Sequence, residues 1–185
     1  MLLANRCMPQ LALLLCACLA DILSYAMTVN SPLERLNLDA KLACEFLGVF
    51  ARYEFALKAV GFAAGDPVQP AWDDYSKFID PAFAKITDDH VKSAVEYLLT
   101  QPPKKQVLRA GKLAWETTLL DNVARAQQVL TMVRRVRNNL FHGGKFAPTE
   151  AGSDPNRDQL LVLHSLAILR ACLPLHGDVE AAFSN

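Results

Sequence analysis

Hydrophobic positions along most of the chain recur with the period of an α-helix. Within residues 38–60 the main apolar side chains fall within about 120° of one helical wheel at 100° per residue. Ser31 before Pro32, with Glu34 in the first turn, has the pattern of an N-cap and capping box, and glycines from Gly61 onward mark a stop. The pattern predicts one long amphipathic helix from Pro32 to about Gly61.

The rest of the chain is predicted to be helical as well. Residues 65–87 are rich in proline and read as a connection with one short helix, residues 88–101 as a short helix, and residues 104–115 as a basic stretch with no clear element. Residues 118–141 predict a second long helix, and residues 157–173 a final one. Since no period-2 strand run or internal repeat is visible, we expect an all-α fold, an up-and-down helical bundle of four to five helices.

Composition limits the kind of protein without naming a function. A length of 185 residues fits one domain, and 52% hydrophobic content supplies a core. The net charge is zero, so any attraction to nucleic acid must come from a local patch. The five cysteines lack metal-ligand spacing and are typical of free thiols in a reducing compartment. No HExxH, Walker A, GxGxxG or paired CxxC motif is present, so we expect no metal and no cofactor.

The first 26 residues differ from the rest. They contain one cation, Arg6, and then an apolar run over residues 11–20, which is too short to span a bilayer as a helix. Ser24 and Ala26 satisfy the small-residue rule of a signal-peptide cleavage site. A signal peptide, an amphipathic helix that docks on the domain, and a start of translation at Met27 all fit this pattern.

We therefore treat residues 1–26 as a leader, signal-like or a mis-called start segment, and residues 27–185 as a single helical domain. The thin positive charge before the apolar run favours a cytoplasmic location over export, and no membrane is expected as a partner.

One arginine of the second long helix lies on its apolar face. Its apolar side chains fill an arc of about 140° on the wheel, and Arg137 falls in the middle of that arc. A guanidinium there needs a partner: a core carboxylate, a symmetry-related surface or a bound anion. Arg135 points to the polar side, as an ordinary solvated charge would, and Arg134 lies at the boundary.

Asn138 and His142 are four residues apart and share a helical face, whereas Arg137 and His142 are five apart, about 140° around the wheel. Arg137 and His142 can therefore converge only if the helix loosens at Gly143 and Gly144, or if a second copy of the chain supplies the partner groups. A two-fold dimer does the latter.

The same region concentrates positive charge. No acidic residue occurs between residues 122 and 149, where the cations are Arg125, Arg134, Arg135, Arg137 and Lys145. Cations at a helix C-terminus are also favoured by the helix dipole, by about 0.3–1 kcal/mol each, so this charge alone does not require a function. The dipole does not explain an arginine on the apolar face.

The stretch "VRRVRNNLFHGGKF", residues 133–146, contains "RNNLFH", which resembles the Arg-x(4–6)-His signature of the HEPN superfamily. The first long helix, with "FLGVFARYEFALKAVGF", is similar to the leading helix of bacterial HEPN proteins. The resemblance covers roughly residues 33–173. HEPN proteins are small α-helical bundles, and many of them are metal-independent ribonucleases of toxin–antitoxin, CRISPR and other defence systems.

This resemblance implies a metal-independent endoribonuclease, a toxin or defence effector, that acts as a homodimer with a composite site. His142 would be the catalytic histidine, Arg137 the phosphate clamp and Asn138 the polar helper, with Arg134 and Lys145 binding substrate. The partners would be RNA, a second copy and an antitoxin-like protein. The products would carry a 2′,3′-cyclic phosphate and a 5′-hydroxyl.

Two other interpretations stay open. The chain can be a non-catalytic HEPN module that binds RNA, a nucleotide or a partner protein, or an exported helical protein whose Arg137 is merely paired in the core. The other histidines have simpler explanations: His90 as a surface residue at a helix start, His164 as a core or interface residue, and His176 as a turn residue. Trp72, Tyr75 and Phe78 are expected to pin the proline-rich connection to the bundle.

Overall fold

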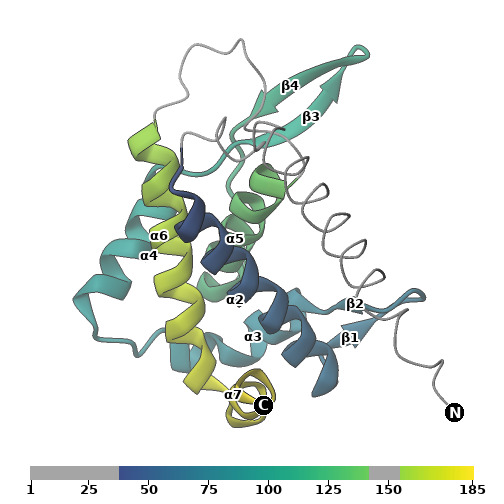
Figure 1. The fold of residues 1–185 in the computed structure, drawn as a ribbon, viewed down its shortest axis with the longest axis vertical. Coiled ribbons are helices and arrows are strands. Elements are labelled where there is room, and N and C mark those ends of the chain that lie inside the picture. Colours follow the sequence, from purple (N-terminus) through teal and green to yellow (C-terminus); the bar gives the residue numbers. More distant parts are fainter. Residues whose placement is uncertain (1–37, 142–154) are drawn as a thin grey trace, which may run out of the picture. The chain divides into compact units, whose positions relative to one another are not determined.

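The computed structural model describes residues 38–141 and 155–185. Helices dominate these residues, and two short antiparallel hairpins accompany them (Figure 1). The elements are α2 (Ala40–Ala59), β1 (Ala63–Ala64), β2 (Gln69–Pro70), α3 (Trp72–Phe83), α4 (Asp89–Thr100), β3 (Lys105–Arg109), β4 (Lys112–Glu116), α5 (Arg125–Phe141), α6 (Pro155–Cys172), a 3₁₀ turn η2 (Leu173–Leu175) and α7 (Gly177–Ser184). The prediction of a mainly helical chain is confirmed, while a purely all-α bundle of four to five helices is too narrow a description.

Helix α2 begins later than its pattern predicts. The carboxylate of Asp39 accepts a hydrogen bond from the backbone N–H of Leu42 at 2.7 Å, which makes Asp39 the N-cap of a helix that starts at Ala40. The predicted start of this helix at Pro32 is therefore wrong. The expected cap at Ser31 and the whole leader, residues 1–26, lie outside the described residues.

Helix α5 also starts later than predicted, at Arg125 instead of near Thr118. Its first turn is capped from another helix, because Oδ1 of Asp80 in α3 accepts a hydrogen bond from the N–H of Ala126 at 2.8 Å. The residues before it are irregular: Asn122 has a φ of 58°, and Leu119 is 48% exposed. The apolar spacing of residues 119–123 belongs to this connection and not to the helix.

The β3–β4 hairpin was not predicted at all. Its strands pair antiparallel, with Leu108 opposite Leu113 and Gln106 opposite Trp115. Ala110 and Gly111 form the turn and both have positive φ, 48° and 76°, as a tight two-residue hairpin turn requires. Turns of this kind usually have Asn-Gly or Asp-Gly at the two central positions, and alanine rarely adopts a positive φ. The sequence Ala-Gly therefore did not indicate a hairpin.

The chain also continues further as helix than expected. The predicted final helix corresponds to α6, and α7 follows it after the 3₁₀ turn. Within the described residues, the segment Asn156–Leu175 is long and apolar enough to cross a membrane by length and composition alone, with 44% of it buried inside the structure. The core helices of soluble proteins pass the same test of length and composition.

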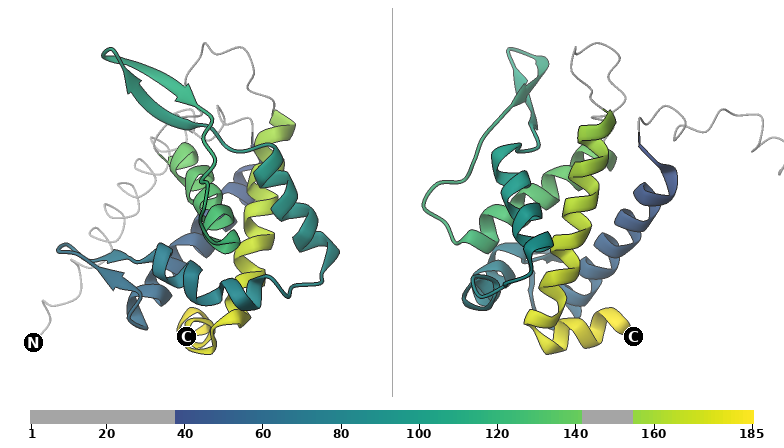
Figure 2. Two further views of the ribbon diagram at one scale, coloured as in Figure 1. Left: turned by 180° about the vertical axis from the view of Figure 1, so that it is seen from behind. Right: turned by 90° about the vertical axis from the view of Figure 1, so that its left-hand side faces the viewer.

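The core lies where the helices cross. Helix α6 packs against α4 and α2, helix α5 against α3 and α4, and helix α7 against α2 (Figure 2). Aromatic side chains fill the space between α2 and α3: the ring of Tyr53 stacks on Trp72 with centroids 5.4 Å apart, and Tyr75 is fully buried. The expectation that Trp72 and Tyr75 pin this segment is confirmed, whereas Phe78 is 60% exposed.

Candidate functional site

Arg137 lies near the C-terminal end of α5 and has an acidic partner on α2. Its Nη2 donates to both carboxylate oxygens of Glu54, at 3.2 Å each. The two side chains are 25% and 23% exposed, so the pair sits at the edge of the core with one side open to solvent. Of the partners expected for this arginine, the structure supplies the carboxylate.

Two aromatic rings hold the same guanidinium. Its central carbon lies 5.0 Å from the centroid of Phe50 and 5.6 Å from that of Phe141. The indole N–H of Trp72 donates to Oε1 of Glu54 at a long 3.5 Å, so the carboxylate is held as well. An arginine fixed by a carboxylate and two rings keeps one orientation, which gives it a defined position at the helix end.

Asn138 completes this cluster. Its Oδ1 accepts a hydrogen bond from Nη1 of Arg137 at 3.0 Å, and its side chain is exposed. Nη2 of Arg137 serves Glu54 and Nη1 serves Asn138, out of the five N–H groups of a guanidinium. The Nε–H has no hydrogen-bond partner within residues 38–141 and 155–185, and it can donate to an anion.

The two neighbouring arginines have other roles. Arg134 pairs with Asp73 of α3 at 3.2 Å, and because these side chains are 39% and 57% exposed the pair lies on the surface. Arg135 is part-buried and donates to the backbone carbonyl of Thr118, just beyond β4. Burial lowers the pKa of Arg135, and the nearby Glu116 opposes that shift. The prediction that Arg135 is an ordinary solvated charge is wrong.

The histidine of the candidate site cannot be placed beside these groups. His142 and Lys145, with the two glycines between them, lie outside the described residues, which stop at Phe141 and resume at Pro155. The structure thus brings Arg137 and Asn138 together, and it directs Arg134 to a different partner.

The other histidines contact neighbours that explain them. The backbone N–H of His90 donates to the Asp88 carboxylate at 2.8 Å, as the predicted helix cap requires. The ring of His164 lies 4.6 Å from that of Tyr97, and burial lowers the pKa of His164. His176 packs its ring against the aromatic side chains before α3 and within it.

A buried chain of hydroxyl groups joins α2, α3 and α6. The hydroxyls of Tyr53 and Tyr75 are 2.6 Å apart, and Tyr75 donates to the carbonyl of Cys172 at 2.9 Å. Burial raises the pKa of both tyrosines above the ordinary value and raises the pKa of the Cys172 thiol to about 12. These groups stay protonated at neutral pH, which suits a structural role and not a nucleophilic one.

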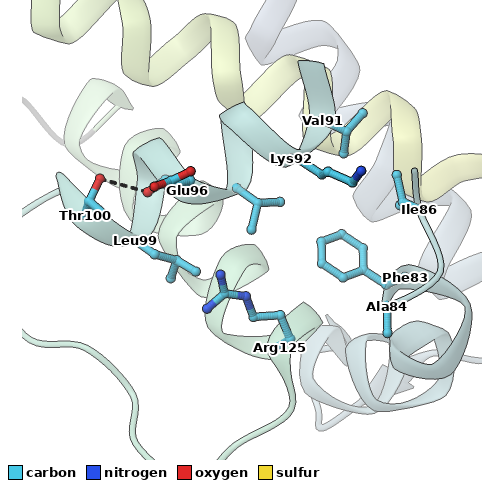
Figure 3. Close-up of a pocket in the computed structure, with 10 residues that line it drawn as sticks. Phe83, Ala84, Ile86, Val91, Lys92, Glu96, Leu99, Thr100 and Arg125 are labelled. Carbon is cyan, nitrogen blue, oxygen red and sulfur yellow. Dashed lines mark hydrogen bonds between the residues drawn. The ribbon is translucent and has the colours of Figure 1, made fainter. Parts of the chain in front are cut away.

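One open groove of about 550 Å³ lies elsewhere, between α3, α4 and the start of α5 (Figure 3). Its wall is largely apolar, and Lys92, Glu96 and Arg125 add charge. Arg125 and Arg137 are twelve residues apart on α5, about 18 Å along the axis at 1.5 Å per residue, so the groove is separate from the Arg137 cluster. No histidine or cysteine lines it.

Glu54 is the site residue that sequence reasoning missed. It follows Phe50 by four residues and therefore shares a helical face with a core aromatic. An acid at the edge of the apolar stripe of one helix, together with an arginine on the stripe of another, was the available signal. Within the described residues, no group of three or more His, Cys, Asp or Glu side chains is placed to hold a metal ion.

Comparisons with protein-family models, with curated proteins and with solved structures find no match. The function must therefore be argued from the residues themselves.

Proposed function

We propose that this chain is a metal-independent endoribonuclease of the HEPN type that acts as a homodimer. The observation that carries the proposal is the Arg137 cluster: a guanidinium held in one orientation, with its Nε–H left for an anion, on the helix whose sequence continues directly into His142. A fixed, permanently charged fork is the group that best matches the oxygens of a phosphodiester.

The chemistry needs few groups. The ribose 2′-hydroxyl loses a proton and attacks the adjacent phosphorus, the bond from phosphorus to the 5′-oxygen breaks, and that oxygen takes up a proton. A histidine side chain can accept or donate a proton near neutral pH, so His142 serves in one of these proton transfers, while Arg137 stabilises the negative charge that builds up on phosphorus. Asn138 orients the histidine or the ribose hydroxyl. The products carry a 2′,3′-cyclic phosphate and a 5′-hydroxyl.

A homodimer supplies the second set of groups. Because Arg137 and His142 are five residues apart, one intact helix aims them in different directions, and a two-fold axis near the end of α5 brings the arginine of one copy to the histidine of the other. In this proposal α2, α4, α5 and α6 form the up-and-down bundle of a HEPN domain, Arg134 and Lys145 assist in binding RNA, and the protein is a cytoplasmic toxin or defence effector held by an antitoxin-like partner.

One observation favours a second candidate, a HEPN module without catalysis. The ion pair with Glu54 already satisfies the charge of Arg137, so no phosphate is required to explain its position. In that case the same surface binds RNA, a nucleotide or a partner protein and cuts nothing.

The two candidates separate in a cleavage assay on a mixed RNA pool with EDTA present. Wild type is compared with His142→Ala and with His90→Ala, a matched control that removes an exposed histidine of α4. Circular dichroism and size-exclusion chromatography establish that all three are folded and equally dimeric. We expect wild type and His90→Ala to cut, leaving cyclic phosphate ends, and His142→Ala to lose at least about a hundredfold in rate.

If His142→Ala cuts as fast as wild type, the proposed role of the "RNNLFH" stretch is wrong. If none of the three proteins cuts but wild type binds RNA, the non-catalytic module is the better account.

A further inference from the structure

The β3–β4 hairpin extends away from the helices in every view (Figures 1 and 2). Side chains alternate across its two faces. One face carries Leu108 and Leu113, which lie opposite each other and are 69% and 70% exposed, with the partly exposed Trp115 next along the strand. A two-stranded ribbon with an uncovered apolar face is only marginally stable in water, so this face is suited to contact something else.

The charge on the hairpin is strongly positive. The segment 104–116 has four cations and one acid, and the acid, Glu116, pairs with Arg109 at 2.6 Å. Lys104, Lys105 and Lys112 are exposed, and none of them forms an ion pair with any residue that the structure describes. In a chain of zero net charge, this is an unbalanced cationic patch.

Side chains of the helices hold both ends of the hairpin. Nδ2 of Asn139 in α5 donates to the carbonyl of Lys104 at 2.8 Å, ahead of β3, and Arg135 donates to the carbonyl of Thr118 after β4. Arg157 of α6 donates to the carbonyl of Pro102 at 3.0 Å. Asn139 and Arg135 flank Arg137 and Asn138 in the sequence. The hairpin is therefore attached by hydrogen bonds to the same turns of α5 that carry the candidate site.

We propose that the β3–β4 hairpin is an arm that binds single-stranded RNA. The face with Leu108, Leu113 and Trp115 lies against the bases. Lys105 and Lys112 alternate onto the other face, and with Lys104 they reach the phosphates around the edges of the two-stranded ribbon. The identity of the nucleic acid rests on the proposed function. A basic groove or ribbon combined with apolar and aromatic side chains is the usual means of holding single strands, because every base has a face to stack. The arm delivers the strand to the Arg137 cluster.

A membrane and a folded protein partner both fit the hairpin less well than RNA. In the strand pairing, Arg109 and Lys112 are the last pair before the turn, and the leucines lie one pair further back. Insertion of this tip into a membrane would therefore carry two cations deeper than the leucines, which is unfavourable. Two leucines and one tryptophan also fall far short of the roughly 800 Å² per partner of a stable protein interface.

The test is binding of a labelled, unstructured RNA by the full chain carrying His142→Ala, followed by fluorescence anisotropy at several salt concentrations. The arm variant is Lys105→Glu/Lys112→Glu. The matched control is Lys77→Glu/Lys92→Glu, which makes the same charge change on exposed lysines of α3 and α4. We expect the arm variant to lose at least about tenfold in affinity and to reduce the slope of log K against log salt by about 1.4, since each phosphate contact on a single strand contributes about 0.7.

A second readout uses tryptophan fluorescence. The chain has two tryptophans, of which Trp72 is 3% exposed, so stacking of bases on the arm should quench Trp115 alone. RNA should quench the emission of the parent protein and not that of a Trp115→Phe variant.

The proposal is overturned if the parent protein does not bind RNA, if the arm and control variants bind equally, or if the arm binds anionic phospholipid vesicles in place of RNA. If RNA binding depends on the arm but the wild-type protein does not cut RNA, the RNA-binding role of the hairpin is supported and the proposed nuclease activity is rejected.

Discussion

The end of α5 and the β3–β4 hairpin are both rich in cations, and the two regions differ in the acidic side chains that lie beside those cations. At the end of α5 two arginines have an acidic partner, because Glu54 pairs with Arg137 and Asp73 pairs with Arg134. Arg135 donates to the backbone carbonyl of Thr118. The exposed lysines of the hairpin have no acidic partner within the described residues.

A run of like charges in a sequence does not by itself give the electrostatic potential at that part of the surface, because acids from distant segments can pair with those charges. The acids that pair with arginines at the end of α5 come from α2 and α3. Glu54 is 83 residues away in sequence from the arginine it pairs with, and Asp73 is 61 away from its own. Attraction of a polyanion depends on the charges that remain unpaired, and of these two regions the hairpin is the one with exposed lysines that form no ion pair with the described residues.

The largest effect on stability should come from unpairing Arg137. Replacing Glu54 with alanine leaves a half-buried guanidinium without its bidentate acceptor, and we expect the free energy of unfolding to fall by about 2 kcal/mol. Equilibrium unfolding in urea measures the loss.

Asp73→Ala is the matched control, since it removes the acid of the exposed Arg134 pair and should cost less than about 1 kcal/mol. Equal losses for the two variants would show that the Glu54 pair is no more than a surface contact.

A smaller, local effect is expected where the two regions join. Asn139→Ala removes the hydrogen bond to the carbonyl of Lys104 and should weaken the attachment of the hairpin by about 1 kcal/mol. Hydrogen exchange followed by mass spectrometry should show faster exchange in residues 105–116, with the protection of α2 and α6 unchanged. Loss of protection throughout the protein would mean that the hairpin is part of the cooperative core.

The smallest effect on stability belongs to the lysines of the arm. Because Lys112 is exposed and forms no ion pair with the described residues, Lys112→Glu should change the free energy of unfolding by less than about 0.5 kcal/mol. Thermal unfolding followed by circular dichroism measures this. A large destabilisation would place Lys112 in a structural contact and would contradict its proposed role in binding RNA.

The same contrast explains what the sequence could predict. Helix α4 was predicted closely, because Asp88 is an N-cap and Pro102 and Pro103 follow its end, so both boundaries are set by local chemistry. The buried face of α5 was also predicted, since Val129, Val133, Val136 and Leu140 are all buried. Periodicity is a local property and is readable in one sequence.

The missed features depend on residues far apart or on weak turn signals. Val107 and Ala114 place apolar atoms on the face of the hairpin opposite Leu108 and Leu113, so no alternation of apolar and polar residues marks its strands. The start of α5 is set by a cap from Asp80, 46 residues earlier. The anomaly of Arg137 was visible on the helical wheel, but its partner was not.

The way the hairpin is attached has an evolutionary consequence. No residue of 105–116 is buried, and the groups that hold its two ends act on backbone carbonyls, which every amino acid possesses. Mutations in the arm are therefore exempt from the purifying selection that packing imposes on the helices. Substitutions in residues 105–116 can therefore change what the hairpin contacts while the packing of the helices is kept.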